Sequence, residues 1–265
     1  KIKQVCIANL RRTDCIMSRL LLSERSNPWT VRLEVGNYCN LRCPLCVREW
    51  VDKDLLNNIH LSVDDVKKFL PKKFLRLYVC AVYLSGAVAE PTLNPDLIEI
   101  VKYLMQHTDV HIDTNGSTSR PEEWWRELGE TGVECEFAPD SLKPDNNVYR
   151  INSNTDRVIR NMKAFISGGG KAIWKHIPYT HNDDEQEEQR EIAESMGAVF
   201  EIAQPRVMPQ KIKAKLGINM PDSLGNNDVQ EVPFYENGTP HFYCKMLGNI
   251  GNNLIEISLQ CKEFY

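Results

Sequence analysis

The chain contains 265 residues, of which 42% are apolar, and this is sufficient for one large domain with a substantial core. Its 32 basic and 36 acidic residues give a formal net charge of −4, which argues against a nucleic-acid partner because there is no basic excess. The longest near-continuous apolar run, at 78–89, is too short to span a bilayer and contains Ser85 and Gly86, so no membrane partner is expected.

The cysteines indicate a reducing compartment. There are nine of them, an odd number, and three cluster at 39–46 instead of being spread as in a disulfide-rich secreted scaffold. The chain starts at Lys1 without the charged and then apolar pattern of a secretory leader. We therefore expect a cytoplasmic location.

Short runs rich in β-branched residues alternate with longer helical patterns, which is typical of βαβ units around a parallel sheet. Six such units are enough for an open barrel and too few for the closed barrel of eight. The sequence therefore predicts an α/β fold, specifically a partial (β/α)6 barrel. The expected strands lie at 31–35, 77–84, 109–113, 133–137, 172–177 and 198–202.

The helices between these strands have recognisable start signals, namely a capping residue, a proline at the first turn, or acids in the first turn. One helix ends at the glycine run 168–170. The expected starts are Ser62 with Asp65, Asn94 with Pro95, Pro121, Thr155, and the acidic stretch that begins at 183.

The alternation stops at about residue 203, where proline, glycine and asparagine become frequent and periodicity is lost. The expected domain organisation is therefore an N-terminal segment at 1–30, the partial barrel at 31–202, and an irregular C-terminal extension at 203–265.

Three cysteines, Cys39, Cys43 and Cys46, follow the first strand closely in the stretch CNLRCPLC. They lie on the loop at the strand's carboxyl end, where barrels and open α/β sheets build their sites. Structural zinc takes four closed ligands, a redox dithiol uses only the CPLC pair, and buried core cysteines fit poorly between Asn40, Arg42 and Pro44. A [4Fe–4S] cluster held by three thiolates is the remaining reading, and it leaves one iron open to a non-protein ligand.

The stretch CNLRCPLC resembles the CxxxCxxC loop of the radical S-adenosylmethionine (SAM) enzymes, which follows the first strand of a partial (β/α)6 barrel. The resemblance implies two cofactors, a [4Fe–4S] cluster and S-adenosylmethionine, with Cys39, Cys43 and Cys46 as the metal ligands. It also implies that the amine and carboxylate of S-adenosylmethionine bind the open iron. Leu45, inside the loop, is then expected at the cofactor.

Three further stretches are similar to motifs of that family, and each departs from the family pattern or has a simpler explanation. SGAVAEPTLNPDL at 85–97 is similar to a glycine-rich GGEP-type turn, but Ala87 and Ala89 replace glycines and add a Cβ to that surface. DTNGS at 113–117 is similar to a TNG turn, although Asn-Gly is also an ordinary turn signal. FAPDSL at 137–142 keeps the aspartate of an SIDG-like segment, but Ala138 replaces the serine.

The resemblance implies cofactor contacts for two residues in the first of these stretches, for one in each of the other two, and for Lys175, which alternates away from Trp174 on the fifth strand. A lysine whose stem covers apolar surface remains an alternative for Lys175. The expected cofactor-binding residues are Leu45, Ala89, Glu90, Asn115, Asp140 and Lys175.

The end of the chain, HFYCKMLGNIGNNLIEISLQC at 241–261, looks like the start of the auxiliary-cluster extension called SPASM or twitch. Cys244 fits its first ligand, and Cys261 is the second candidate. Two thiolates cannot complete a four-iron cluster, so an auxiliary Fe–S cluster and a degenerate extension without metal both remain open.

The resemblance implies an enzyme that cleaves S-adenosylmethionine reductively to a 5′-deoxyadenosyl radical, which abstracts hydrogen from a substrate. The expected partners are a peptide or small polar substrate and a reductase, flavodoxin or ferredoxin as electron donor. The alanines at 87, 89 and 138 motivate an alternative, an Fe–S protein that has lost cofactor cleavage and acts as a binding or regulatory partner. No residue is assigned as a catalytic acid, base or radical relay.

Overall fold

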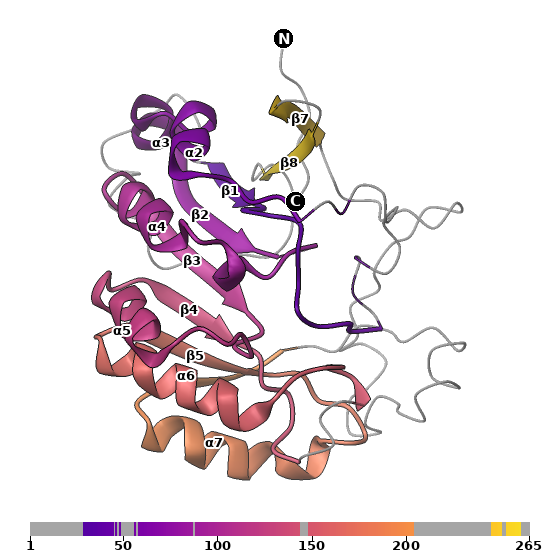
Figure 1. The fold of residues 1–265 in the computed structure, drawn as a ribbon. Helices are drawn as coiled ribbons and strands as arrows, with labels where there is room; N and C mark the ends of the chain where they lie inside the picture. Colours follow the sequence, from indigo (N-terminus) through magenta and orange to yellow (C-terminus); the bar gives the residue numbers. More distant parts are fainter. Residues whose placement is uncertain are drawn as a thin grey trace, which may run out of the picture.

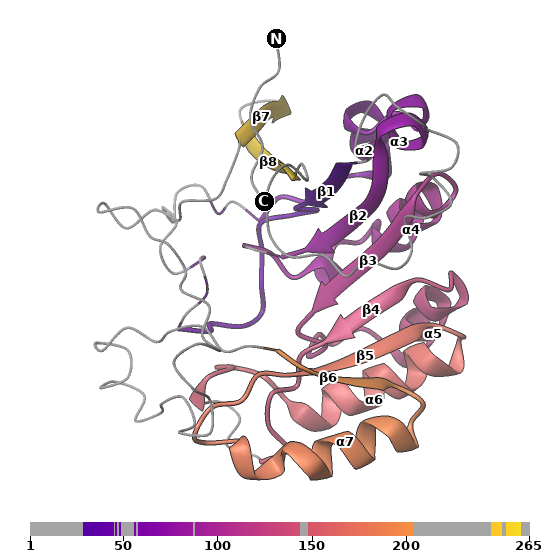
Figure 2. The ribbon, with the colours of Figure 1, turned by 180° about the vertical axis from the view of Figure 1, so that it is seen from behind.

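The computed structural model describes residues 29–44, 46, 48, 56, 58–86, 88–143, 148–203, 245–250 and 253–260. Their main feature is one curved sheet with the strand order β6-β5-β4-β3-β2-β1-β8-β7. Helices α2 to α7 follow one side of this sheet in chain order (Figure 1). Seen from behind, the sheet runs from β1 to β6, and among the described residues no strand joins these two, as in an open barrel (Figure 2).

The first six strands pair in parallel with their sequence neighbours. Each lies within two residues of its predicted place, so the predicted partial (β/α)6 barrel is confirmed. The strands are β1 Trp29–Leu33, β2 Val79–Ser85, β3 Asp109–Thr114, β4 Glu134–Phe137, β5 Lys171–His176 and β6 Val199–Ile202.

The C-terminal extension contains two strands that the sequence analysis did not predict, β7 (Lys245–Ile250) and β8 (Asn253–Gln260). They pair antiparallel with each other, and β8 pairs antiparallel with β1. The expectation of an irregular extension is therefore wrong for these residues. The backbone groups at the open side of β1 are the hydrogen-bonding partners of β8, which in turn pairs with β7. Such long-range pairing has no local sequence signal.

The helices agree with most of the predicted start signals. Ser62 caps α2 through a capping box with Asp65, as expected. Pro121 precedes α5, and α6 ends at Gly168 within the glycine run. The helices are α2 Val63–Phe69, α3 Lys72–Tyr78, α4 Leu97–Met105, α5 Glu122–Glu130, α6 Thr155–Ser167 and α7 Gln186–Ser195, with the short 3-10 turns η3 Pro91–Leu93 and η5 Asp183–Glu185.

Three boundaries differ from prediction. α3 was not predicted, and it displaces the start of β2 from residue 77 to Val79. Asn154 caps α6, one residue before the predicted Thr155. Asp96, two residues after the predicted Asn94, is the N-cap of α4. The Asn94 Oδ1 accepts from the amide of Asp96 at 2.7 Å, and its side-chain NH2 donates to the carbonyls of Val35 and Leu61 at 2.7 and 2.9 Å. Asn94 thus ties the loop after β2 to the segment after β1.

The sheet face toward the helices forms the core. On β1 to β5 most of its side chains are buried, and they alternate with mainly polar residues on the opposite face. Among the described residues, no helix is long and apolar enough to cross a membrane. The core residues on this face include Val31, Leu33, Val82, Leu84, Val110, Ile112, Cys135, Phe137 and Trp174.

Helices α5 and α6 lie side by side (Figure 1), and two glycines permit their close approach. A Cβ at Gly129 would lie 2.1 Å from the carbonyl oxygen of Phe165, and one at Gly168 would lie 2.1 Å from that of Arg126. These distances are far below van der Waals contact. The two helices therefore cannot accept a larger residue here without moving apart.

We expect Gly129→Ala to lower the free energy of unfolding by about 1–3 kcal/mol, because overpacking outweighs the gain in helix propensity. Urea denaturation followed by tryptophan fluorescence measures this change. Glu127→Ala, at a half-exposed position of the same helix, is the matched control, and its free energy of unfolding should stay close to that of the unaltered protein. Equal stability of Gly129→Ala and the control would contradict the packing described.

Candidate functional site

The cysteine loop begins directly after β1 and passes over the carboxyl ends of the strands. A cavity of about 530 Å³ opens beside it. The site therefore lies at the edge of the sheet that the sequence analysis predicted. The cavity is lined by Tyr38, Cys39, Asn40, Leu41, Arg42, Arg48, Leu56 and Asn152.

Backbone hydrogen bonds fix this loop at several points. The carbonyl of Tyr38 accepts from the amide of Glu90 at 2.8 Å, and the amide of Arg42 donates to the carbonyl of Ile151 at 3.1 Å. The amide of Cys46 donates to the carbonyl of Cys43 at 2.9 Å, which makes a tight turn around Pro44. The loop is thus held by segments that follow β2 and β4.

Glu90 is the central polar group beneath the loop, with only 4% of its surface exposed. Its Oε1 accepts from the backbone amide and hydroxyl of Thr92 at 3.0 and 2.7 Å and from the hydroxyl of Thr114 at 2.6 Å. Its Oε2 accepts from the amide of Asn115 at 2.8 Å. Burial raises the pKa of Glu90, and these hydrogen bonds oppose the shift. In the described structure the carboxylate binds the chain itself, and a direct cofactor contact for Glu90 stays a prediction.

Asn115 connects Glu90 to the first cysteine. Its side-chain amide lies 3.8 Å from Cys39 Sγ and donates to Asn40 Oδ1 at 3.0 Å. The next residue, Gly116, has a φ of 68°, and a Cβ there would lie 2.8 Å from Val158. The TNG turn therefore needs its glycine and aims the asparagine at the cysteine loop.

The turn after β2 depends on Gly86. A Cβ at that position would lie 1.4 Å from the carbonyl oxygen of Ala89, so no other residue fits this backbone. Ala89 itself is buried, with 7% of its surface exposed, next to Glu90. Ala87 lies outside the described residues.

The three cysteines lie close enough to influence one another. Burial, together with Glu90, Cys43 and Cys46, raises the pKa of Cys39 to about 12, and burial raises the pKa of Cys43 to about 11. The Cys39 and Cys43 thiols are therefore protonated at neutral pH without metal, and metal binding would displace their protons. Within the described residues no three Cys, His, Asp or Glu side chains converge on a single-ion position.

A four-iron cluster needs a different arrangement of ligand atoms from a single metal ion. Each thiolate binds its own iron at a separate corner, so the sulfurs face one volume without converging on a point. Cys39, Cys43 and Cys46 lie near one another on one short loop, and Cys39 lines the cavity, which fits this arrangement. A tetrahedral zinc ion would bring four ligand atoms around one centre.

Arg150 lies against this loop, and the sequence analysis missed it. Its guanidinium hydrogen-bonds the Cys43 sulfur and pairs with the fully buried carboxylate of Asp140. That ion pair and the nearby cysteine raise the pKa of Arg150 and keep it charged. Arg150 follows Tyr149 in a loop without periodicity, so the local sequence does not indicate that this arginine belongs to the site. Only the approach of the loops after β1 and β4 makes the contact.

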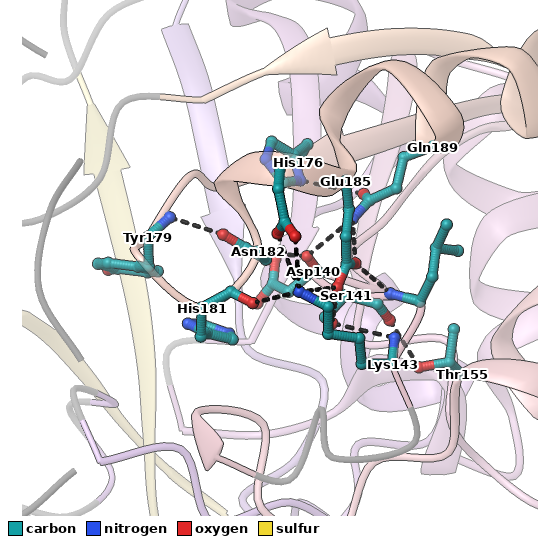
Figure 3. Close-up of polar contacts among 12 residues, drawn as sticks. Asp140, Ser141, Lys143, Thr155, His176, Tyr179, His181, Asn182, Glu185 and Gln189 are labelled. Carbon is teal, nitrogen blue, oxygen red and sulfur yellow. Dashed lines mark hydrogen bonds and ion pairs between the residues drawn. The ribbon is translucent and has the colours of Figure 1, made fainter. Parts of the chain in front are cut away.

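Asp140 is held in an unusual conformation, with a φ of 60°. Its carbonyl accepts from the amide side chains of Asn182 and Gln189 at 2.6 and 3.1 Å. Figure 3 shows these contacts together with Glu185, which accepts from the Ser141 hydroxyl at 2.9 Å. The carboxylate oxygen Oδ1 of Asp140 is buried without a hydrogen-bond partner in the described structure. This network fixes the loop after β4 and thereby the place of Arg150.

Lys175 lies apart from this group. It lies on the sheet face opposite the helices and pairs with Glu136 of the neighbouring strand. The structure therefore brings Cys39, Cys43, Cys46, Glu90, Asn115 and Asp140 together, while Lys175 belongs to the adjacent strand surface. Leu45, Cys244 and Cys261 lie outside the described residues, and their predicted roles stay predictions.

A family model described as the radical SAM superfamily matches residues 33–195. The tungsten-containing aldehyde ferredoxin oxidoreductase cofactor-modifying protein of Pyrococcus furiosus is 32% identical over 125 residues, 45% of this chain and 33% of that protein. GTP 3′,8-cyclase of Klebsiella pneumoniae is 32% identical over 108 residues, 39% of this chain and 32% of that protein. The chain thus spans about a third of the length of these curated relatives.

Solved structures show the same fold. The Streptococcus suis protein SuiB bound to S-adenosylmethionine is 17% identical and superposes with a TM-score of 0.54 over 71% of this chain and 43% of its own. SuiB bound to the precursor peptide SuiA is 16% identical, with a TM-score of 0.55 over 71% of this chain and 42% of its own. At this identity the likeness concerns the partial barrel.

We expect Glu90→Gln to destabilise the protein by about 1–3 kcal/mol, because its side-chain NH2 would face donors where the carboxylate now accepts. Chemical denaturation of the metal-free protein measures the change. Glu99→Gln on α4, where the side chain is 62% exposed, is the matched control and should have little effect. A Glu90→Gln variant as stable as this control would show that the carboxylate does not hold the loop.

Proposed function

Because this chain belongs to the radical SAM superfamily, we propose that it is an enzyme whose cysteine loop holds a [4Fe–4S] cluster and binds S-adenosylmethionine. The chemistry supplied by the bound cofactors is reductive cleavage of the sulfonium to methionine and a 5′-deoxyadenosyl radical, which abstracts hydrogen from the substrate. The observation that supports this most directly is the contact of Asn115 with Cys39 beside an open cavity.

The residues of the chain contribute positioning and charge. Cys39, Cys43 and Cys46 would hold the cluster. Asn115 donates toward the Cys39 sulfur, and Glu90 fixes Asn115 from beneath. Hydrogen bonds to ligand sulfurs and limited solvent access are among the factors that set the potential of an iron–sulfur cluster. These residues would therefore tune the cluster.

Arg150 is the second contribution that we propose. A guanidinium beside Cys43 places positive charge where a thiolate and an anionic cofactor carboxylate would lie. Asp140 acts through Arg150, because its carboxylate orients the guanidinium. Its predicted role in cofactor binding thus becomes a positioning role in this proposal.

The substrate that we propose is a peptide or another polar molecule that reaches the open side of the barrel. The structure of SuiB with its precursor peptide supports the peptide alternative by analogy of fold. A reductase or a flavodoxin- or ferredoxin-type protein would supply the electron, and the cysteine loop at the strand ends would be its target.

The alternative is an Fe–S protein that binds a cluster without cleaving S-adenosylmethionine. Ala138 motivates it, because a methyl group stands where a hydroxyl is expected and the residue is 9% exposed. Loss of one hydrogen bond to the cofactor would weaken its binding.

Anaerobic reconstitution with iron and sulfide, followed by dithionite and S-adenosylmethionine, tests the proposal. We expect a brown protein that forms 5′-deoxyadenosine, detected by chromatography, and loss of that product in Cys43→Ala. Cys80→Ala, which removes a strand cysteine outside the loop, is the matched control and should retain it. A brown protein that forms no product would favour the Fe–S alternative, and a colourless protein would exclude both.

We expect Arg150→Ala to lower the yield of 5′-deoxyadenosine by about tenfold or more, since a charge-assisted hydrogen bond is lost. The yield from Arg150→Lys should lie between those of the unaltered protein and Arg150→Ala, because lysine keeps a cation beside Asp140 without the planar guanidinium. Iron and sulfide content and the melting temperature separate this effect from loss of cluster or fold. Arg76→Ala at an exposed position of α3 is the control. A wild-type yield from Arg150→Ala would contradict the assignment.

A further inference from the structure

Two adjoining hollows near the cysteine loop have arginines as most of their charged lining residues. The first is the cavity beside Cys39, where the charged residues are Arg42 and Arg48. The second has a volume of about 520 Å³ and lies where the start of α5 meets α6. Its arginines are Arg120, Arg157 and Arg160.

The arginines of the second hollow bind mostly to uncharged groups. Arg120 donates to three backbone carbonyls at 2.9, 3.1 and 3.1 Å, and Arg157 donates to the carbonyl of Ser117 at 3.4 Å. A carbonyl satisfies an N–H group without cancelling the positive charge. Arg160 Nε lies 3.6 Å from Glu122 Oε1, but both side chains are about half exposed, where water and salt weaken an ion pair. The hollow therefore keeps positive charge at its surface.

This positive charge is local, because the chain as a whole has a formal net charge of −4. Acidic residues are concentrated at η5 and α7, which carry seven of them and one arginine. The two hollows instead contain five arginines, and among the described residues only Glu122 and Glu123 line them as carboxylates. Such segregation of charge orients an acidic partner toward the hollows during its approach.

Hydrogen bonds connect the second hollow to the first cysteine. The carbonyl of Ser117 accepts from Arg157 at 3.4 Å and also from the Asn40 side chain at 3.2 Å. Asn40 Oδ1 accepts from Asn115 at 3.0 Å, and the Asn115 amide lies 3.8 Å from Cys39 Sγ. Electron transfer between proteins slows steeply with distance. A partner bound over these hollows would therefore be close enough to a ligand sulfur to exchange electrons.

We propose that the two hollows together form the docking surface for an acidic one-electron carrier protein of the flavodoxin or ferredoxin type. The proposal rests on the proposed function, because that reaction consumes one electron for each S-adenosylmethionine cleaved. In the transfer the reduced carrier loses one electron to the cluster, and no covalent bond forms or breaks. Charge complementarity selects the partner, since a basic carrier would be repelled by the same arginines.

Binding of a purified flavodoxin to the full chain tests the docking surface directly. The probe is an oxidised flavodoxin of negative net charge with its FMN bound, and calorimetry at several salt concentrations measures its affinity. We expect the affinity to fall as the salt concentration rises, because dissolved ions screen exposed charges. This measurement does not depend on the formation of 5′-deoxyadenosine.

The variants Arg157→Glu and Arg160→Glu should each lower the affinity for flavodoxin by about tenfold, because each reverses a charge at the surface that steers and holds the partner. Arg76→Glu makes the same change at an exposed position of α3 outside both hollows, and it should bind flavodoxin like the unaltered chain. Melting temperatures report whether each variant is folded. Arg157→Gln and Arg160→Gln, which only remove the charge, replace a reversal that does not fold and should lower the affinity less.

Three results would overturn the proposal. They are no binding of flavodoxin, binding that is independent of salt, and equal affinities of the hollow variants and Arg76→Glu. Formation of 5′-deoxyadenosine is measured separately with dithionite, a small reductant that needs no protein docking surface. A chain that forms this product and does not bind flavodoxin would retain the proposed function and lose the docking surface. A chain that binds flavodoxin through these arginines and forms no product would retain the surface and lose the proposed function.

Discussion

The candidate site depends on the buried carboxylate of Glu90. Its two oxygens accept from Thr92, Thr114 and Asn115, and its own amide donates to the carbonyl of Tyr38 at 2.8 Å. One residue thus joins the loop after β2 to the end of β3 and to the cysteine loop. Burying a carboxylate is costly unless its oxygens are satisfied, so this arrangement has few alternatives.

The rest of the site is built from the same kind of connection between strand ends. Asp140, after β4, orients Arg150, and the guanidinium reaches Cys43 on the loop after β1. The turn after β3 thus contacts Cys39 and the loop after β4 contacts Cys43, so segments distant in sequence meet at the same cysteine loop. Because the carboxyl ends of parallel strands lie at one edge of the sheet, short loops are sufficient for these contacts.

The sheet separates packing from chemistry by its alternation. One face buries apolar residues such as Leu84, Ile112 and Trp174 against the helices, and the other presents charged side chains. A one-residue shift in register would exchange the two faces, so the core fixes the orientation of the polar layer. The stability of the barrel and the composition of its polar face therefore depend on the same register.

The departures from the family pattern have different structural consequences. At the turn after β2, Gly86 lies too close to the carbonyl of Ala89 for a Cβ, and Ala89 is buried next to Glu90. Ala138 is different, because it is buried and offers no hydrogen-bonding group where the pattern has a hydroxyl. Arg150 and Asp140 supply polar contacts in the same region.

The sequence by itself determined the six parallel strands and most of the helices between them, with α3 as the exception, because alternation and capping are local signals. It also determined the cysteine loop, whose spacing is contained in eight residues, Cys39 to Cys46. Only the tertiary structure decided the pairing of β8 with β1, the use of Glu90 as a tie between loops, the contact of Arg150 with Cys43, and the placement of Lys175 beside Glu136. Each of these joins residues far apart in the chain, and such contacts depend on register and loop path, which no short stretch of sequence encodes.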